Sequence, residues 1–333
     1  MTQMDAAPDK TDGGLFTFVT IVFRGDIALL RLQAQSMARF IDPDTVSSIL
    51  LVLNDVDEPG LRGMIADLLD SYGPLRSKLR IVSGDDLLLR PDRKHKKTLF
   101  ERIYVENRFR IPFVGRGGWR GGNGYRFQQA LKLASARAAT SENMVILDGK
   151  NIFLRAPDPY ELFGRDGRAI GTFAKVVPDF HRNWLAESLD VLSVQVPLQD
   201  IQETVGYSTP YSVKRKLLLN LLDEIEAGYG SVQALFASKR RPSEFMLIHV
   251  FCLKHFGGPD RMFANCGRRN IGIWGDFDAA QVDAVLAEAE AQTPLTFGLH
   301  RKAVANLNPG QRQKVQGLFE AKGLDAARVL TVV

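Results

Sequence analysis

Cysteine is scarce in this chain of 333 residues. The two that occur, Cys252 and Cys266, form no Cys-x-x-Cys pair, and they do not make a disulfide framework. We therefore expect free thiols and a reducing compartment. Histidine is also scarce, and four of the five histidines have no spacing typical of metal ligands.

Long apolar runs are missing too. No stretch approaches the roughly 20 residues that span a bilayer. The first apolar run, residues 15–23, has neither a basic region before it nor a small-residue cleavage site, so it does not resemble a signal peptide. We expect a cytoplasmic protein.

Residues 90–97 form a basic stretch, Arg-Pro-Asp-Arg-Lys-His-Lys-Lys. One interpretation is an ordinary solvated loop. The other is a patch that attracts phosphate or an anionic membrane surface, which would give peripheral contact with the inner face of a membrane.

The sequence also lacks the common glycine-rich signatures of nucleotide binding. No G-x-G-x-x-G follows the first predicted strand, which counts against a dinucleotide-binding Rossmann domain, and no P-loop motif occurs. A net charge of +5 still fits an anionic ligand such as a nucleotide. The chain lacks the interleaved aromatic and basic residues of nucleic-acid binders, so we expect no nucleic-acid partner.

What the chain does contain is an alternation of strands and helices. The apolar runs at 15–23, 48–53 and 79–82 predict strands, and amphipathic helices are predicted after Asp26 and after Pro59-Gly60. Such an alternation predicts an α/β fold with an open, mostly parallel sheet flanked by helices.

Residues 143–155 form the stretch around which we expect the rest of the chain to be organised. A buried-strand pattern at 144–147 ends at Asp148, and a turn leads to a second apolar run at 152–154. A polar group at the carboxyl end of such a strand lies where open α/β sheets bind ligands. The alternative is an ordinary turn with a solvated aspartate.

Before this stretch come a glycine-rich segment at 115–124 and a predicted helix at 125–138. Trp119 within the segment favours a binding loop over a flexible linker, because linkers rarely contain a large anchor. Later segments predict strands at 169–176 and 271–274, and helices at 184–194, 213–229, 245–255, 278–291 and 308–322.

Several short motifs resemble the DUF6492 family, a bacterial glycosyltransferase-like group of the GT-A type. They are Gly118-Trp119, Gln128-Gln129, Lys132-Leu133, the strand that ends at Asp148-Gly149-Lys150, Ser243-Glu244-Phe245 and His300-Arg301. The resemblance covers about residues 15–305.

This resemblance implies a GT-A fold, with a nucleotide-sugar donor and a glycan or lipid-linked acceptor. It implies a donor-binding α/β half at 14–175 and a mostly helical acceptor-side half of the same domain at 176–333. Residues 1–13 are polar and lack periodicity, which predicts a disordered tail. In the family pattern an Asp-x-Asp motif holds a divalent cation, Mn²⁺ or Mg²⁺, against the diphosphate of the donor.

The second aspartate of that motif is Lys150 here. Three interpretations follow. Lys150 could itself supply the positive charge, because an ammonium group binds phosphate well. A cation could instead bind through Asp148 and His300 while Lys150 points away. The site could also be inactive, leaving a protein that binds nucleotide sugars or glycans without catalysis.

The resemblance and the ends of the predicted strands together give the candidate site. Lys150 and Glu244 are the candidate catalytic residues, Glu244 as a general base if the reaction inverts. Glu244 alternatively only stabilises the start of a helix, and Asp26 is alternatively a helix N-cap. The candidate residues for binding the nucleotide sugar are Arg24, Asp26, Asn54, Trp119, Gln129, Lys132, Asp148, His300 and Arg301.

Overall fold

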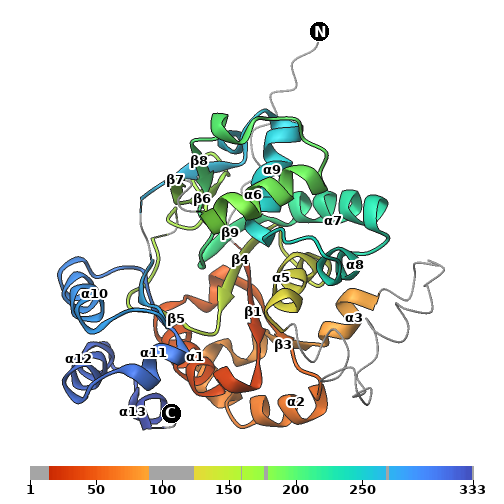
Figure 1. Ribbon diagram of the computed structural model, residues 1–333. Helices are drawn as coiled ribbons and strands as arrows, with labels where there is room; N and C mark the ends of the chain where they lie inside the picture. Colours follow the sequence, from red (N-terminus) through yellow and green to blue (C-terminus); the bar gives the residue numbers. More distant parts are fainter. Residues whose placement is uncertain (1–14, 90–123, 159, 176–178, 268–269, 332–333) are drawn as a thin grey trace, which may run out of the picture.

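The computed structural model describes residues 15–89, 124–158, 160–175, 179–267 and 270–331. A five-stranded sheet with the order β3-β2-β1-β4-β9 forms its centre (Figure 1). Strands β1 to β4 are parallel and β9 is antiparallel to β4, so the predicted open, mostly parallel sheet is confirmed. The five strands are β1 (Phe16–Val22), β2 (Val46–Leu53), β3 (Leu79–Val82), β4 (Asn143–Asp148) and β9 (Tyr211–Lys214).

Helices cover this sheet, and the part of the chain after residue 175 is largely helical, as predicted (Figure 1). No helix within the described ranges combines the length and the apolar character that crossing a bilayer needs. The α-helices are α1 (Ile27–Phe40), α2 (Glu58–Ala66), α3 (Gly84–Leu89), α5 (Gly124–Ala134), α6 (Asp179–Val191), α7 (Arg215–Tyr229), α8 (Val232–Ala237), α9 (Glu244–Phe256), α10 (Ala279–Gln292), α11 (Arg301–Asn306), α12 (Pro309–Glu320) and α13 (Ala327–Thr331).

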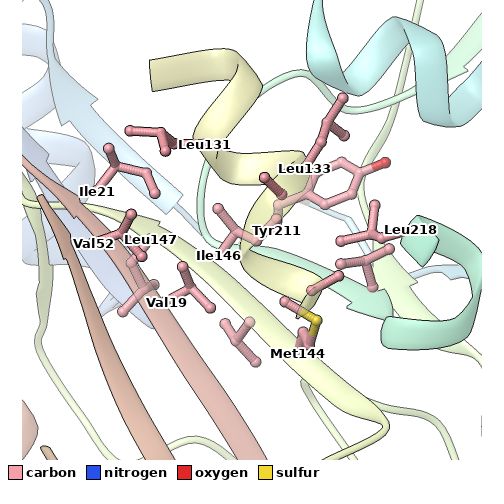
Figure 2. Packing of buried hydrophobic residues seen from close by; sticks show 14 of the residues in the cluster. Val19, Ile21, Val52, Leu131, Leu133, Met144, Ile146, Leu147, Tyr211 and Leu218 are labelled. Atoms are coloured by element: carbon pink, nitrogen blue, oxygen red, sulfur yellow. The ribbon is translucent and has the colours of Figure 1, made fainter. Parts of the chain in front are cut away.

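Strand β4 is buried on both faces, which explains its continuous apolar sequence. Met144, Ile146 and Leu147 have no exposed surface. Figure 2 shows side chains of α5, β9 and α7 packed around β1 and β4. Each such side chain contributes roughly 1.5–3 kcal/mol when it is fully buried. The carboxyl end of β4, where Asp148 stands, therefore follows directly on a buried segment of the core.

A second, smaller sheet with the order β11-β12-β5 joins the C-terminal part of the chain to the turn after β4. It contains β5 (Asn151–Phe153), β11 (Asn270–Ile273) and β12 (Thr296–Leu299). β11 and β12 are parallel, so the residues after them, Trp274 and His300, emerge at the same edge. The amide of Leu299 donates to the carbonyl of Lys150 at 3.0 Å, which brings His300 beside that turn.

Gly272 and Gly298 allow the two parallel strands to approach closely. A Cβ atom at Gly272 would lie 2.5 Å from the carbonyl oxygen of Gly298. A larger residue at position 272 would push β11 away from β12, and would separate Trp274 from His300.

The prediction of one strand at 169–176 is wrong. The segment forms two short strands, β6 (Ala169–Gly171) and β7 (Phe173–Lys175), which belong to different sheets. β6 pairs with β10 (Phe263–Asn265), whereas β7 pairs with β8 (Glu203–Val205). The chain changes partner at Thr172, whose carbonyl accepts from the amide of Gly206. The pattern of apolar residues in the sequence cannot reveal that a strand changes its pairing partner.

The helix predicted from residue 213 begins later, at Arg215. Val213 and Lys214 instead pair with β4 as the end of β9. The apolar side chain of Val213 fits either element, and pairing with a buried strand decides between them.

The buried side chain of His249 in α9 makes the stability of the fold depend on pH. This side chain is 1% exposed, and burial lowers its pKa from 6.5 to about 4. The folded state therefore favours the neutral imidazole. The neutral side chain contributes its full stabilisation of the folded state above pH 6.5, where the imidazole is also neutral in the unfolded chain. We expect a loss of roughly 3 kcal/mol in the free energy of unfolding as the pH falls from 6.5 to 4.

Urea unfolding of the wild type and of His249→Met at several pH values measures this effect. The curve for His249→Met should lack the extra loss of stability, because methionine does not titrate. Parallel curves for the two proteins would contradict the assignment.

Candidate active site at the carboxyl edge of the sheet

A cavity of about 620 Å³ lies at the carboxyl ends of β1, β4, β11 and β12. Ligand pockets of proteins commonly have volumes between about 300 and 1,000 Å³. The ionisable side chains that line it are Asp26, Tyr125, Lys132, Asp148, Lys150, His181, Tyr207, Glu244, Asp276, His300 and Arg301.

Asp148 lies at the centre of the charged floor of this cavity. Its Oδ1 atom accepts from the Gln128 amide at 3.0 Å and lies 3.0 Å from the Lys132 ammonium. Its Oδ2 atom accepts from the Thr209 hydroxyl at 3.0 Å and lies 3.3 Å from the Lys150 ammonium. Both carboxylate oxygens are thus already bonded to donors of the protein.

The turn after β4 is fixed by the side chain of Asn151. Its Oδ1 atom accepts from the backbone amide of Asp148 at 2.7 Å, and its Nδ2 atom donates to the carbonyl of Thr209 at 3.1 Å. Gln33 of α1 donates to the carbonyls of Asp148 and Asn151. Because these groups are buried, the turn has one well-defined shape, and Asp148 and Lys150 keep their relative positions.

Lys132 joins two buried carboxylates that come from different elements. Its ammonium lies 3.0 Å from Asp148 and 3.1 Å from Glu244, the first residue of α9. It also lies 5.0 Å from the centre of the Phe245 ring. The other oxygen of Glu244 accepts from the Ser243 hydroxyl at 3.2 Å. The helix α5 thereby connects the end of β4 to the start of α9.

Asp148 and Lys132 stay ionised despite their burial. Burial opposes the charged form of Asp148, but Lys132 and Lys150 outweigh it and hold the pKa of the carboxyl far below its usual range. Burial likewise opposes the charged form of Lys132, but Asp148 and Glu244 outweigh it and raise the pKa of Lys132 above its usual value. At neutral pH Asp148 is therefore anionic and Lys132 is cationic.

Lys150 is the more accessible of the two lysines. Its side chain is 19% exposed, whereas that of Lys132 is 7% exposed. Its ammonium lies 4.2 Å from the centre of the Trp274 ring, a distance typical of a cation–π contact. The ring of His300 lies beyond, 6.5 Å from that of Trp274. Burial and the neighbouring cation of Lys150 lower the pKa of His300, which favours a neutral imidazole.

Asp26 and Arg301 face each other on the wall of the cavity, with 3.3 Å between Oδ1 and Nε. Asp26 occupies the N-cap position of α1, as one of the two interpretations predicts, but its side chain makes no capping hydrogen bond. Burial raises the pKa of Asp26, and Arg301 opposes that rise.

Arg24 does not line the cavity and pairs with Asp55. It makes two hydrogen bonds of 2.6 Å to the Asp55 carboxylate. Asn54 lines the cavity and donates to the carbonyl of Gly124 at 3.1 Å. Trp119 and the basic stretch 90–97 lie outside the described residues, so the predictions for them stay predictions.

The donor set does not fit a divalent cation. The described residues contain no cluster of three or more histidine, cysteine and acidic side chains that could hold a metal ion. Lys150 does not point away from Asp148, as binding through Asp148 and His300 would require. Two ammonium groups stand where a cation would need to approach, and the Nδ1 atom of His300 accepts from the backbone amide of Lys302.

The sequence of residues 19–271 matches the model of a family described as a family of unknown function, DUF6492. This match covers most of the chain. The protein belongs to the DUF6492 family. Among curated proteins, none matches the chain.

Several solved structures resemble this DUF6492 protein at low sequence identity. The WbbM bifunctional glycosyltransferase has a TM-score of 0.43 at 12% identity, over 88% of this chain and 47% of that one. The glycosyltransferase GlyE of Streptococcus pneumoniae has a TM-score of 0.40 at 12% identity, over 94% of this chain and 61% of that one. Mouse xyloside xylosyltransferase 1 has a TM-score of 0.41 at 9% identity, over 85% of this chain and 97% of that one. The chain thus spans less than two thirds of the first two.

The cavity of the DUF6492 protein brings together residues that are far apart in the sequence. The predicted residues that line it are Asp26, Asn54, Gln129, Lys132, Asp148, Lys150, Glu244, His300 and Arg301. Sequence reasoning missed Gln128, Thr209 and Trp274, although Gln128 belongs to the Gln-Gln pair and Trp274 ends a predicted strand. Thr209 carries no signal, because only the pairing of β9 with β4 brings it to Asp148.

The two lysines should differ strongly in their effect on stability. Lys132→Met leaves the buried carboxylate of Glu244 without its cation, so we expect a loss of about 3–5 kcal/mol in the free energy of unfolding. Lys150→Met leaves Asp148 paired with Lys132, so we expect a loss of about 1 kcal/mol or less. Chemical denaturation of both variants at pH 7 measures the difference. Equal losses would contradict the described network.

Proposed function

We propose that this protein is a glycosyltransferase, which moves a sugar from a nucleotide-sugar donor to a glycan or lipid-linked acceptor without a metal ion. The observation that carries the proposal is Asp148 held between Lys132 and Lys150 on the floor of a ligand-sized cavity. Its position at the carboxyl edge of a parallel sheet is where α/β proteins bind ligands. The TM-scores above are all below 0.5, so the proposal rests on this site.

Lys150 takes the role of the cation in this proposal. When the bond between the anomeric carbon and the diphosphate breaks, the leaving oxygen keeps the electron pair and gains negative charge. A positioned cation stabilises that charge. An ammonium group has three hydrogen-bond donors, and Asp148 occupies one donor of Lys150. The remaining donors and the 19% exposure of the side chain leave Lys150 able to reach a phosphate oxygen.

Lys132 acts in this proposal as a positioning residue. Its ammonium is bonded to two carboxylates and is almost fully buried, so it holds Asp148 and Glu244 in place. In an inverting reaction Glu244 accepts the proton of the acceptor hydroxyl while the oxygen of that hydroxyl bonds to the anomeric carbon. Its Oε2 atom supports this role, since the hydrogen bond of that atom among the described residues comes from the neutral Ser243 hydroxyl and not from a cation.

The wall of the cavity supports binding of a sugar and a nucleoside. The side-chain carbonyl of Gln129 is buried and has no hydrogen-bond partner among the described residues, which a donor on the ligand would satisfy. Trp274 and Tyr207 supply aromatic faces of the kind that bury the apolar faces of sugars. Asn54, Asp26 and Arg301 stand near the ends of β1 and β2, and we assign them to the nucleotide. We further propose a cytoplasmic location, with membrane contact through residues 90–97.

A donor assay tests the proposed function. The protein is incubated with UDP-, GDP-, CMP- and dTDP-sugars, and thermal shift and donor hydrolysis are measured with EDTA and with Mn²⁺. We expect one class of donor to raise the melting temperature and to be hydrolysed equally well with EDTA. No shift with any donor would exclude the transferase. Hydrolysis that requires Mn²⁺ would exclude the role of Lys150.

The same assay on two variants isolates the charge of Lys150. We expect Lys150→Ala to lower the turnover at least 100-fold with little change in melting temperature, which corresponds to roughly 3 kcal/mol of lost transition-state stabilisation. Lys150→Arg should keep more activity than Lys150→Ala because it retains the positive charge. Full turnover in Lys150→Ala would show that the assignment is wrong.

A further inference from the structure

A second cavity, of about 310 Å³, adjoins the first. Residues of β6, β7, β8, β9 and β11 line it, together with the turn between β8 and β9. Tyr207, Ser208, Thr209 and Trp274 line both cavities. The second cavity therefore begins directly behind the wall that bounds the charged floor.

The shared wall is held in place by contacts to the charged centre. The Thr209 hydroxyl donates to Asp148, and the Thr209 carbonyl accepts from the buried amide of Asn151. Trp274 is in contact with the Lys150 ammonium, at 4.2 Å from its ring centre. A ligand in the second cavity would thus lie next to the group that we assign to the leaving diphosphate.

The lining of the second cavity differs in chemistry from that of the first. None of the described residues that line it is acidic, basic or a histidine. Hydroxyl and amide groups come from Thr172, Ser208, Ser212 and Asn270, and aromatic rings come from Tyr207, Tyr211 and Trp274. Hydroxyl and amide groups exchange hydrogen bonds with a hydroxylated ligand, and aromatic rings cover its apolar face. Among the described residues that line this cavity, a charged ligand would find no partner of opposite sign, and it would lose its hydration.

We infer that the second cavity binds the acceptor, and that the acceptor presents a neutral sugar there, stacked on Trp274 and reaching toward Lys150 and Glu244. This inference rests on the proposed transferase function and adds the class of its second substrate. It also makes Trp274 a residue that both substrates contact.

Binding of simple sugars to the wild type gives the first test. Ligand-detected NMR is recorded with the methyl glycosides of glucose, galactose, mannose and rhamnose, and with glucuronic acid and glucose 6-phosphate as charged probes. We expect at least one neutral glycoside to bind, and to remain bound when saturating UDP or GDP fills the first cavity. Displacement by the nucleotide, or binding of charged probes alone, would overturn the inference.

A variant that narrows the second cavity gives the second test. Ala174 in β7 lines this cavity and not the first, so Ala174→Phe places a ring inside it. Lys175→Phe is the matched control, because the next residue of a strand points to the opposite face and Lys175 is exposed and lines neither cavity. We expect Ala174→Phe to weaken glycoside binding at least tenfold and Lys175→Phe to leave it unchanged.

The two tests separate this inference from the proposed function. If nucleotide sugars bind and are hydrolysed but no neutral glycoside binds, the transferase stands and the inference fails. If glycosides bind but no nucleotide sugar does, the transferase fails, and with it the assignment of the sugar as an acceptor. If Ala174→Phe does not fold, the competition experiment on the wild type decides whether a neutral sugar binds outside the first cavity.

Discussion

The sharing of Asp148 between Lys132 and Lys150 is the constraint on which the rest of the site depends. Two ammonium groups lie within 3.3 Å of one carboxylate at the end of β4, a strand whose residues 143–147 are all buried. A buried charge that loses its partner costs several kcal/mol. The fold therefore has to bring α5, β4 and the turn after β4 to the same point, and the contacts of Gln33, Gln128, Asn151 and Thr209 serve that end.

This arrangement also determines what the site can bind. A carboxylate that accepts from four protein donors has little capacity left for a hard cation, which prefers free carboxylate and water oxygens. The lysine on its exposed side retains free donors and faces the cavity. Phosphate is a better ligand for such a group than a metal is.

The sequence predicts the core of this account because its signals are local. The apolar run of β4, the carboxylate after it and the helical pattern of α5 are all visible without a structure. The site residues that the sequence does not reveal come together through pairing between distant segments. Thr209 reaches Asp148 only because β9 pairs antiparallel with β4, and Trp274 reaches Lys150 only because the sheet β11-β12-β5 closes on the same turn. The break in the strand at Thr172 is hidden for the same reason, since the partner strands lie far along the chain.

The central claim is that Asp148 holds two lysines and not a metal ion. Titration of the protein with Mn²⁺, followed by electron paramagnetic resonance in the presence of a nucleoside diphosphate, tests it directly. The account predicts no stoichiometric Mn²⁺ binding by the wild type and a gain of binding in Lys150→Asp, which replaces one ammonium group with a second carboxylate. One Mn²⁺ bound tightly per wild-type chain, and lost in Asp148→Asn, would contradict it.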